Sequence, residues 1–312
     1  MRWAAKALDW IKAGEPCALV AILAAEGSTP REAGTRMVVT GSQIFGTIGG
    51  GNLEFQVIDQ ARQALKHPAG TWRIQDYPLG VLLGQCCGGR VRVLIEYLDP
   101  AHSAWLEVVR DRPAFGLKSV LLSGGIRRDV VPVGAPPLTA RGPIPADGDV
   151  LIETVGTPLT PVVMFGAGHV GIAIARVLKD LPFALSWYDD RSDVPPDVHV
   201  TVADDLCAAA AANDGLTLIL THDHALDYEL TRAALASPAA FIGLIGSKTK
   251  RHRFFSRLTK AGHGAADLAR IHCPIGIEGI AGKAPEIIAV SVAAQLLVEA
   301  WKVTSPAPVT VP

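Results

Sequence analysis

One glycine-rich turn in the second half of the chain constrains the fold more than any other feature. The turn, Gly166-Ala167-Gly168-His169-Val170-Gly171, follows a β-branched run from Val162 to Phe165 and opens an amphipathic helix. In this setting Gly166 makes the tight turn, Gly168 lets a phosphate approach the backbone, and Gly171 packs the helix on the strand. The N–H groups at the start of the helix then favour an anion. The turn indicates a phosphate-bearing ligand, the alternative being a tight turn that holds none.

Strands and helices alternate through the rest of this half. The further strands that we expect are Phe183 to Tyr188, Val198 to Val202, Thr217 to Leu220 and Phe241 to Ile245. Such alternation is typical of right-handed βαβ units and of a parallel sheet covered on both faces. We therefore predict an α/β chain with a Rossmann-like, doubly wound domain over 158–312. Two segments rich in Pro and Gly, 134–149 and 156–161, mark the boundary between the two halves, which we place near residue 158.

Polar residues follow several of these predicted strands. Ligands of open α/β sheets bind outside the carboxyl ends of the strands, so we expect such residues to meet at one edge. Asp189 is placed to accept a ribose hydroxyl, and His169 either donates to a phosphate or caps the helix. The candidate residues at this edge are Asp189, His222, Asp223, Ser247 and Lys248. The alternative for His222 and Asp223 is a polar loop satisfied by backbone groups.

The first half, 1–157, is predicted to be an α+β domain. A helix from Trp3 to Lys12 precedes a strand from Cys17 to Ala25, and a glycine run at 49–51 opens a helix that ends near Lys66. The run forms a backbone nest but lacks the Gly-Lys-Ser/Thr ending of a P-loop, so ATP hydrolysis by that route is not expected. Glu54 is an acid or base, or the partner of a helix cap, and the cap is the favoured interpretation.

The most chemically distinctive motif of this half is Cys86-Cys87-Gly88-Gly89. A thiolate binds soft metals or accepts sulfur, provided that it is exposed near a cation. Arg31 and Arg36 lie in and after a polar loop and are candidates to clamp a phosphate. The alternative is one buried cysteine with an incidental neighbour. Five cysteines without paired Cys-x-x-Cys clusters argue against a disulfide framework or a structural zinc site.

Charge and hydropathy exclude several classes of protein. Lys and Arg number 29 against 30 Asp and Glu, so no global field attracts nucleic acid or anionic lipid. No apolar stretch approaches the ~18 residues of a membrane span, and the most apolar run, Ile287 to Trp301, is expected to be a buried helix. The first ten residues lack the apolar core of a secretory signal, so a cytoplasmic location is expected. The basic run from Lys248 to Arg257 flanks an anion site or a partner surface, or is a solvated helix face.

Seven blocks of this sequence resemble the XdhC/CoxI family. They are GSTPREAGTRM (27–37), GTIGGGNLE (46–54), CGG (87–89), FGAGHVG (165–171), THDHALDYEL (221–230), FIGLIGSKTKR (241–251) and PIGIEGIAGKAPEIIAVSVAAQ (274–295). Because the blocks run through both halves, the resemblance covers nearly the whole chain. Their combination is more specific than the glycine turn alone.

The resemblance implies a chaperone of the molybdenum cofactor (molybdopterin) and not an enzyme. Such a protein binds the cofactor as cargo, supports its sulfuration and inserts it into apo xanthine dehydrogenase. The implied partners are the molybdenum-binding subunit of that enzyme, a cysteine desulfurase and the proteins of cofactor biosynthesis, and a homodimer is compatible with the composition. Cys87 becomes the candidate ligand of molybdenum, with Cys86 as its rival, and the turn at 166–171 takes the pterin phosphate or nucleotide.

Two rival functions remain open at this point. The glycine turn alone suggests an NAD(P)-dependent oxidoreductase, with His222 or Lys248 as proton donor. The third hypothesis is an enzyme that transfers sulfur or a nucleotidyl group to the cofactor, with Cys87 as persulfide carrier.

Overall fold

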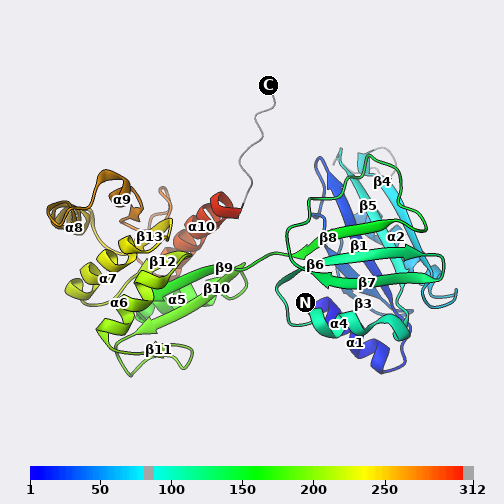
Figure 1. The fold of residues 1–312 in the computed structure, drawn as a ribbon, viewed down its shortest axis with the longest axis horizontal. Coiled ribbons are helices and arrows are strands. Elements are labelled where there is room, and N and C mark those ends of the chain that lie inside the picture. Colours follow the sequence, from blue (N-terminus) through cyan, green and yellow to red (C-terminus); the bar gives the residue numbers. More distant parts are fainter. Residues whose placement is uncertain (81–87, 305–312) are drawn as a thin grey trace. The chain divides into compact units, whose positions relative to one another are not determined.

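The computed structural model describes residues 1–80 and 88–304, and the chain divides into two compact units, Met1–Pro158 and Leu159–Pro312 (Figure 1). Cys86 and Cys87 lie outside the described residues. Within those residues, no helix combines the length and the apolar character that crossing a membrane requires.

Two antiparallel sheets form the framework of the first unit. The larger sheet has the order β3-β2-β1-β5-β4 and the smaller has the order β7-β6-β8. The strands are β1 (Ala18–Glu26), β2 (Arg36–Val39), β3 (Ile44–Gly46), β4 (Trp72–Pro78), β5 (Arg90–Tyr97), β6 (Ala114–Leu122), β7 (Gly125–Val131) and β8 (Val150–Gly156). The helices are α1 (Arg2–Lys12), α2 (Gly51–Ala64), a 3₁₀ turn (Pro100–His102) and α4 (Ala104–Val109).

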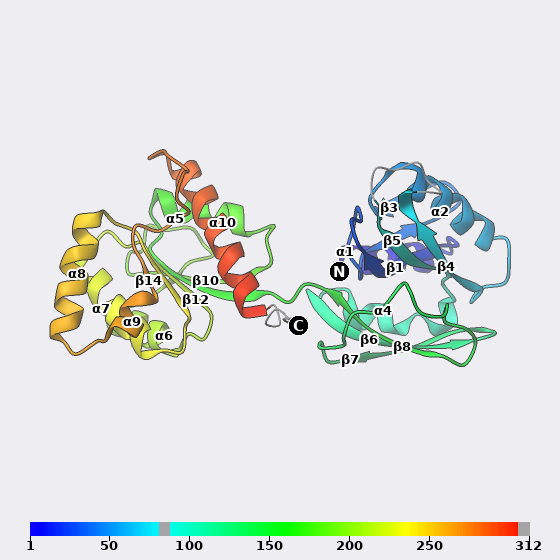
Figure 2. The same cartoon turned by 90° about the horizontal axis from the view of Figure 1, so that it is seen from above.

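Strand β1 is apolar on both faces because it lies between two layers. Val20 and Ile22 pack toward α2, whereas Ala21 and Leu23 pack toward Leu121 and its neighbours in the smaller sheet. Figure 2 shows this order of layers, with α2, the larger sheet and the smaller sheet in succession. The predicted α+β character of this half is confirmed.

A six-stranded parallel sheet forms the centre of the second unit, in the order β11-β10-β9-β12-β13-β14. The strands are β9 (Thr160–Phe165), β10 (Phe183–Asp189), β11 (His199–Val200), β12 (Leu216–Ile219), β13 (Phe241–Leu244) and β14 (Ile271–His272). Counted within the unit this is 3-2-1-4-5-6, the order of a dinucleotide-binding sheet, and the direction of winding changes between β9 and β12.

Helices cover both faces of this sheet. They are α5 (His169–Leu178), α6 (Ala203–Ala212), α7 (His224–Ala236), α8 (Lys248–Lys260), α9 (Ala265–Ala269) and α10 (Pro285–Thr304). Helices α5 and α10 contribute to the core on one face, and α6, α7 and α8 to the core on the other (Figure 2). The predicted Rossmann-like, doubly wound domain is confirmed.

The expectation that the apolar run 287–301 is a buried helix is wrong for one of its faces. Helix α10 buries Val292 and Leu296 against the sheet and α5, but Val290, Val298 and Trp301 are 54%, 52% and 71% exposed. The helix covers the sheet from one side only, and within the second unit nothing in the described part of the chain covers its outer face.

Candidate functional site

The three glycines of the turn after β9 have different surroundings. Gly166 has a φ of +112°, and a Cβ added there would lie 2.3 Å from the Leu220 carbonyl oxygen. A Cβ on Gly171 would lie 2.2 Å from the Gly166 carbonyl oxygen. A Cβ on Gly168 would meet nothing within 4 Å. Gly166 and Gly171 are therefore required by packing, whereas Gly168 faces open space after the end of β9.

Gly168 is also the N-cap residue of α5, and no side chain caps this end of the helix in the described part of the unit. His169 is the first helical residue and is exposed. An uncapped helix start beside open space offers backbone N–H groups and the positive end of the helix dipole to an anion. The arrangement suits a phosphate group.

Asp189, at the end of β10, holds this turn in place. Its carboxylate accepts a hydrogen bond from the Ala167 N–H (2.6 Å) and two from the Arg191 guanidinium (2.8 and 2.7 Å). Burial on its own would raise the pKa of Asp189, but the hydrogen bonds from Arg191 and Ala167 outweigh it and hold the pKa far below its usual value. The Arg191 N–H donates a fourth hydrogen bond (2.9 Å to Oδ1), so each oxygen already accepts two, and the expected contact with a ribose hydroxyl requires one of these bonds to be replaced.

Two of the other predicted edge residues cap helices. Asp223 accepts a hydrogen bond from the Ala225 N–H (2.7 Å) at the start of α7, and Ser247 accepts one from the Lys250 N–H (3.2 Å) at the start of α8. Strand β12 ends at Ile219, so it does not continue through His222. His222 and Lys248 are exposed in the loop after β12 and at the start of α8.

A buried ion pair that the sequence does not single out joins the two loops beyond β12 and β13. Lys250 Nζ donates to Asp227 Oδ2 and to the Ile245 carbonyl (3.0 Å), and the two side chains are 9% and 0% exposed. Asp227 Oδ1 also accepts from the N–H and the hydroxyl of Thr221 (3.1 and 2.7 Å). The pair therefore fixes the backbone that presents His222 and Lys248. Lys250 lies in a run of similar cations, and nothing local marks it as the buried one.

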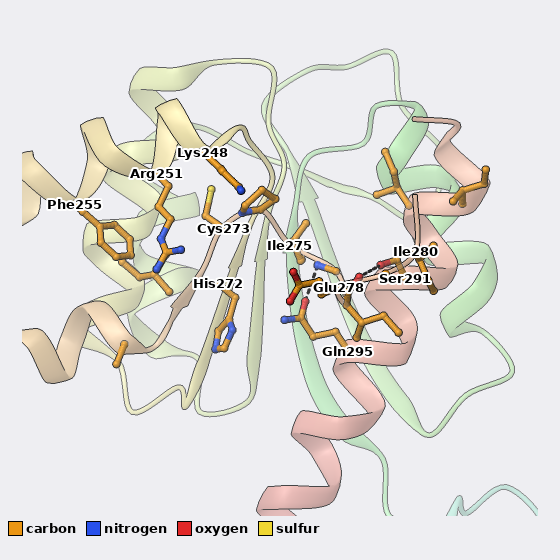
Figure 3. Close-up of a pocket in the computed structure, with 18 of the residues that line it drawn as sticks. Lys248, Arg251, Phe255, His272, Cys273, Ile275, Glu278, Ile280, Ser291 and Gln295 are labelled. Carbon is orange, nitrogen blue, oxygen red and sulfur yellow. Dashed lines mark hydrogen bonds between the residues drawn. The ribbon is translucent and has the colours of Figure 1, made fainter. Parts of the chain in front are cut away.

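A cavity of about 900 Å³ lies beside β14 (Figure 3). Its walls come from α8 and α9 on one side and from α10 and the loop 273–282 on the other. Of the predicted site residues that the structure describes, only Lys248 lines it. The glycine turn and this cavity are thus separate features of the unit.

The glycine-bearing blocks of the first unit lie side by side. A Cβ on Gly89 would come within 2.3 Å of the Ser28 carbonyl oxygen, and a Cβ on Gly49 within 2.5 Å of Pro30 Cβ. A Cβ on Gly88 would meet nothing within 4 Å. The segments 26–31, 47–51 and 88–89 therefore pack together, and the exposed side chain of Arg31 lies among them. The roles expected of Cys86 and Cys87 remain predictions.

Glu54 caps the backbone N–H groups of the glycine segment that precedes α2. Its carboxylate accepts hydrogen bonds from the N–H groups of Ile48 (2.9 Å) and Gly50 (3.1 Å) and from the Thr47 hydroxyl. Burial would raise the pKa of Glu54, but these hydrogen bonds lower it below its usual value. The favoured interpretation of Glu54 as a capping residue is confirmed.

Arg36 is not placed to clamp a phosphate. Its side chain is 1% exposed, pairs with Glu153 of β8 at 2.6 Å and donates to the Gly34 carbonyl at 2.8 Å. The arginine ties the two sheets together, so of the two predicted arginine clamps only Arg31 keeps an exposed guanidinium. Residues 1–80 and 88–304 contain no group of three or more His, Cys, Asp and Glu placed to hold a metal ion.

The strand order of the second unit and the open glycine turn at its switch point place this unit in the Rossmann class. Residues 162–296 match the family model described as the XdhC Rossmann domain, and residues 10–77 match the model of the XdhC and CoxI family. The chain belongs to the XdhC/CoxI family.

Two proteins to which the chain is similar differ in length. The uncharacterized protein YqeB of Escherichia coli (strain K12) is 26% identical over 294 residues, which are 90% of this chain and 43% of YqeB. The chain thus spans less than half of that relative. The crystal structure of a xanthine dehydrogenase from Bacillus halodurans superposes with a TM-score of 0.72 at 21% identity, covering 98% of both chains. At this identity the second likeness shows the fold alone.

Proposed function

We propose that this chain is an accessory protein that carries the molybdenum cofactor to xanthine dehydrogenase and does not turn over a small substrate. Membership of the XdhC/CoxI family supports the accessory role, and the structural neighbour is itself described as a xanthine dehydrogenase. The observation that carries the proposal is the open Gly168 position at the uncapped start of α5. It suits the phosphate that a molybdopterin carries.

The chain's own residues have separate tasks in this proposal. The backbone N–H groups after Gly168 bind an anionic group of the cargo, and Asp189 keeps the turn in shape through its bond to the Ala167 N–H. Cys87 is the proposed thiolate near molybdenum or its sulfido ligand, since soft metals prefer sulfur ligands. Arg31, exposed in the first unit, supplies positive charge.

The proposed partners follow from the proposed cargo. They are apo xanthine dehydrogenase, a cysteine desulfurase that supplies sulfur, and the proteins that deliver the finished cofactor. The proposed location is the cytoplasm.

Reconstitution of apo xanthine dehydrogenase tests the proposal. The purified chain, loaded with molybdenum cofactor, is expected to activate the apoenzyme faster than the same amount of free cofactor, and Gly168→Ala is expected to reduce this gain. Equal activation with and without the chain would contradict the proposal. Saturable binding of NADH together with hydride transfer would favour the oxidoreductase instead.

A further inference from the structure

Helix α10 crosses one face of the parallel sheet and carries an apolar stripe on the side turned away from it (Figure 2). The stripe consists of Ile287, Val290, Ala294, Leu297, Val298 and Trp301. Ala294 is half-buried and the other five side chains are exposed. No charged residue occurs from 287 to 298. This side of the helix therefore lacks the polar character of a solvated face.

The spacing of the stripe is that of a helix that packs on another helix. Its members at 287, 290, 294, 297 and 301 follow one another at intervals of three, four, three and four residues. This is the alternation of the a and d positions of a coiled coil. On an α-helix the stripe occupies an arc of about 100°. Val292 and Leu296, which lie outside the stripe, pack on the sheet and α5, so α10 has a second apolar face to bury.

The area of the stripe reaches what a specific interface needs. From the exposed fractions of its side chains, the stripe presents on the order of 500 Å² in each copy of the chain, or about 1,000 Å² in a pair of copies. Specific protein interfaces bury at least about 1,000 Å² in total. Scattered apolar residues on a surface are normal, but a contiguous patch of this size marks an interaction surface.

The stripe is also complementary to itself when two copies of α10 run antiparallel. In an antiparallel pair each a position lies opposite a d position, so Ala294 faces Leu297 of the other copy and Val290 faces its Trp301. A small residue thus meets a larger one in every layer, and each layer occurs twice about a two-fold axis. At the end of the stripe, Lys302 pairs with Glu299 of its own helix at 2.7 Å and brings no uncompensated charge to this face.

We propose that a second copy of this chain packs on the stripe, with the two α10 helices antiparallel across a two-fold axis that passes between Ala294 and Leu297. Trp301 is the main anchor of this interface, because it is the largest and most exposed side chain of the stripe. The proposal depends on α10 alone and does not rest on the proposed function.

The test is analytical ultracentrifugation of the full chain. Between about 1 and 200 μM the mass is expected to rise from 32.8 kDa towards twice that value, because an interface of this size gives a dimer that dissociates on dilution. Trp301→Ala and Val290→Glu are each expected to weaken the dimer at least about tenfold, since each change occurs twice in a symmetric interface. Val108→Glu, which alters an exposed valine of α4, is the matched control and should leave the dimer unchanged.

An exchange of charges tests the antiparallel arrangement. Chains with Val290→Glu are mixed with chains that carry Trp301→Lys. Antiparallel helices place the new carboxylate opposite the new ammonium group, so the mixture is expected to recover about tenfold or more of the affinity that each variant loses alone. Parallel helices would place position 290 opposite position 290, and no recovery would follow.

Three results would overturn the proposal. The first is a single-chain mass throughout the concentration range; a lower melting temperature of Trp301→Ala would then identify the first unit of the same chain as the occupant of the stripe. The second is a dimer that Val290→Glu leaves intact, which would place the interface on another face. The third is a mixture of the two charged variants that recovers no affinity. Each of these results would leave the proposed function standing.

Discussion

The substitution Gly168→Ala separates ligand binding from stability at the glycine turn. Gly168 has φ −76° and ψ −174°, which alanine adopts freely, and the new Cβ would meet no protein atom within 4 Å. Alanine is a poorer N-cap, at a cost of about 1 kcal/mol or less, but it also restricts the unfolded chain, which gains about 0.4–1 kcal/mol. The two effects nearly cancel, so the melting temperature is expected to change by less than about 4 °C.

In the proposed function, the same methyl group occupies the space through which the phosphate of the cargo would reach the start of α5. Losing one charged hydrogen bond costs about 1.5–3 kcal/mol, which is a weakening of about 10- to 150-fold in Kd. The assay is a paired titration with molybdenum cofactor and thermal unfolding of the same preparations. Gly171→Ala is the contrast, because its Cβ would lie 2.2 Å from the Gly166 carbonyl oxygen and should lower stability by about 1–3 kcal/mol. Unchanged affinity in Gly168→Ala would refute the assignment of the anion site.

Three further predictions concern stability and reactivity. Lys250→Met leaves the buried Asp227 carboxylate unpaired and is expected to lower the free energy of unfolding by about 3–5 kcal/mol, measured by urea titration; a loss near zero would show that the pair does not hold the two loops. Because the folded pKa of Asp189 is depressed, its stabilising effect is present above the unfolded pKa of about 3.9 and is lost as the pH falls below it. Acid unfolding should therefore be steeper in the wild type than in Asp189→Asn, and identical curves would contradict this. Burial raises the pKa of Cys17 to about 12 and also raises that of Cys273, so both thiols should resist iodoacetamide in the native protein, and rapid labelling of either, read by mass spectrometry, would be the adverse result.

The sequence predicts those parts of the molecule that local pattern determines. The turn at 166–171 and the alternation of short β-branched runs with helices predict the parallel sheet, and the predicted strand Phe183 to Tyr188 agrees with β10 (Phe183–Asp189) to within one residue. Asp223 and Ser247 were placed correctly at the edge of the sheet, but their side chains serve as helix caps. Side chains of these types follow strands whether they cap a helix or bind a ligand.

Features that depend on contacts between residues far apart in the sequence could not be predicted from local pattern. Arg36 pairs with Glu153 from a strand of the other sheet, so its burial has no local signal. The cavity beside β14 has walls from α8 and from the loop before α10, and the position of that loop depends on the hydrogen bond from the Gly276 N–H to Gln295. The exposed outer face of α10 differs from the fully buried helix that its apolar composition predicts. Apolar composition alone does not show how many sides of a helix are covered by the rest of the domain.

The most direct test of the central claim is the amount of molybdenum and of pterin bound by the purified chain. Wild type and Cys87→Ala are mixed with molybdenum cofactor or with NADH, freed of unbound ligand, and analysed for molybdenum, for pterin fluorescence after oxidation and for nicotinamide fluorescence. The proposed function predicts molybdenum and pterin in amounts stoichiometric with the wild-type chain, less in Cys87→Ala, and no retained NADH. Retained NADH without molybdenum or pterin would contradict it.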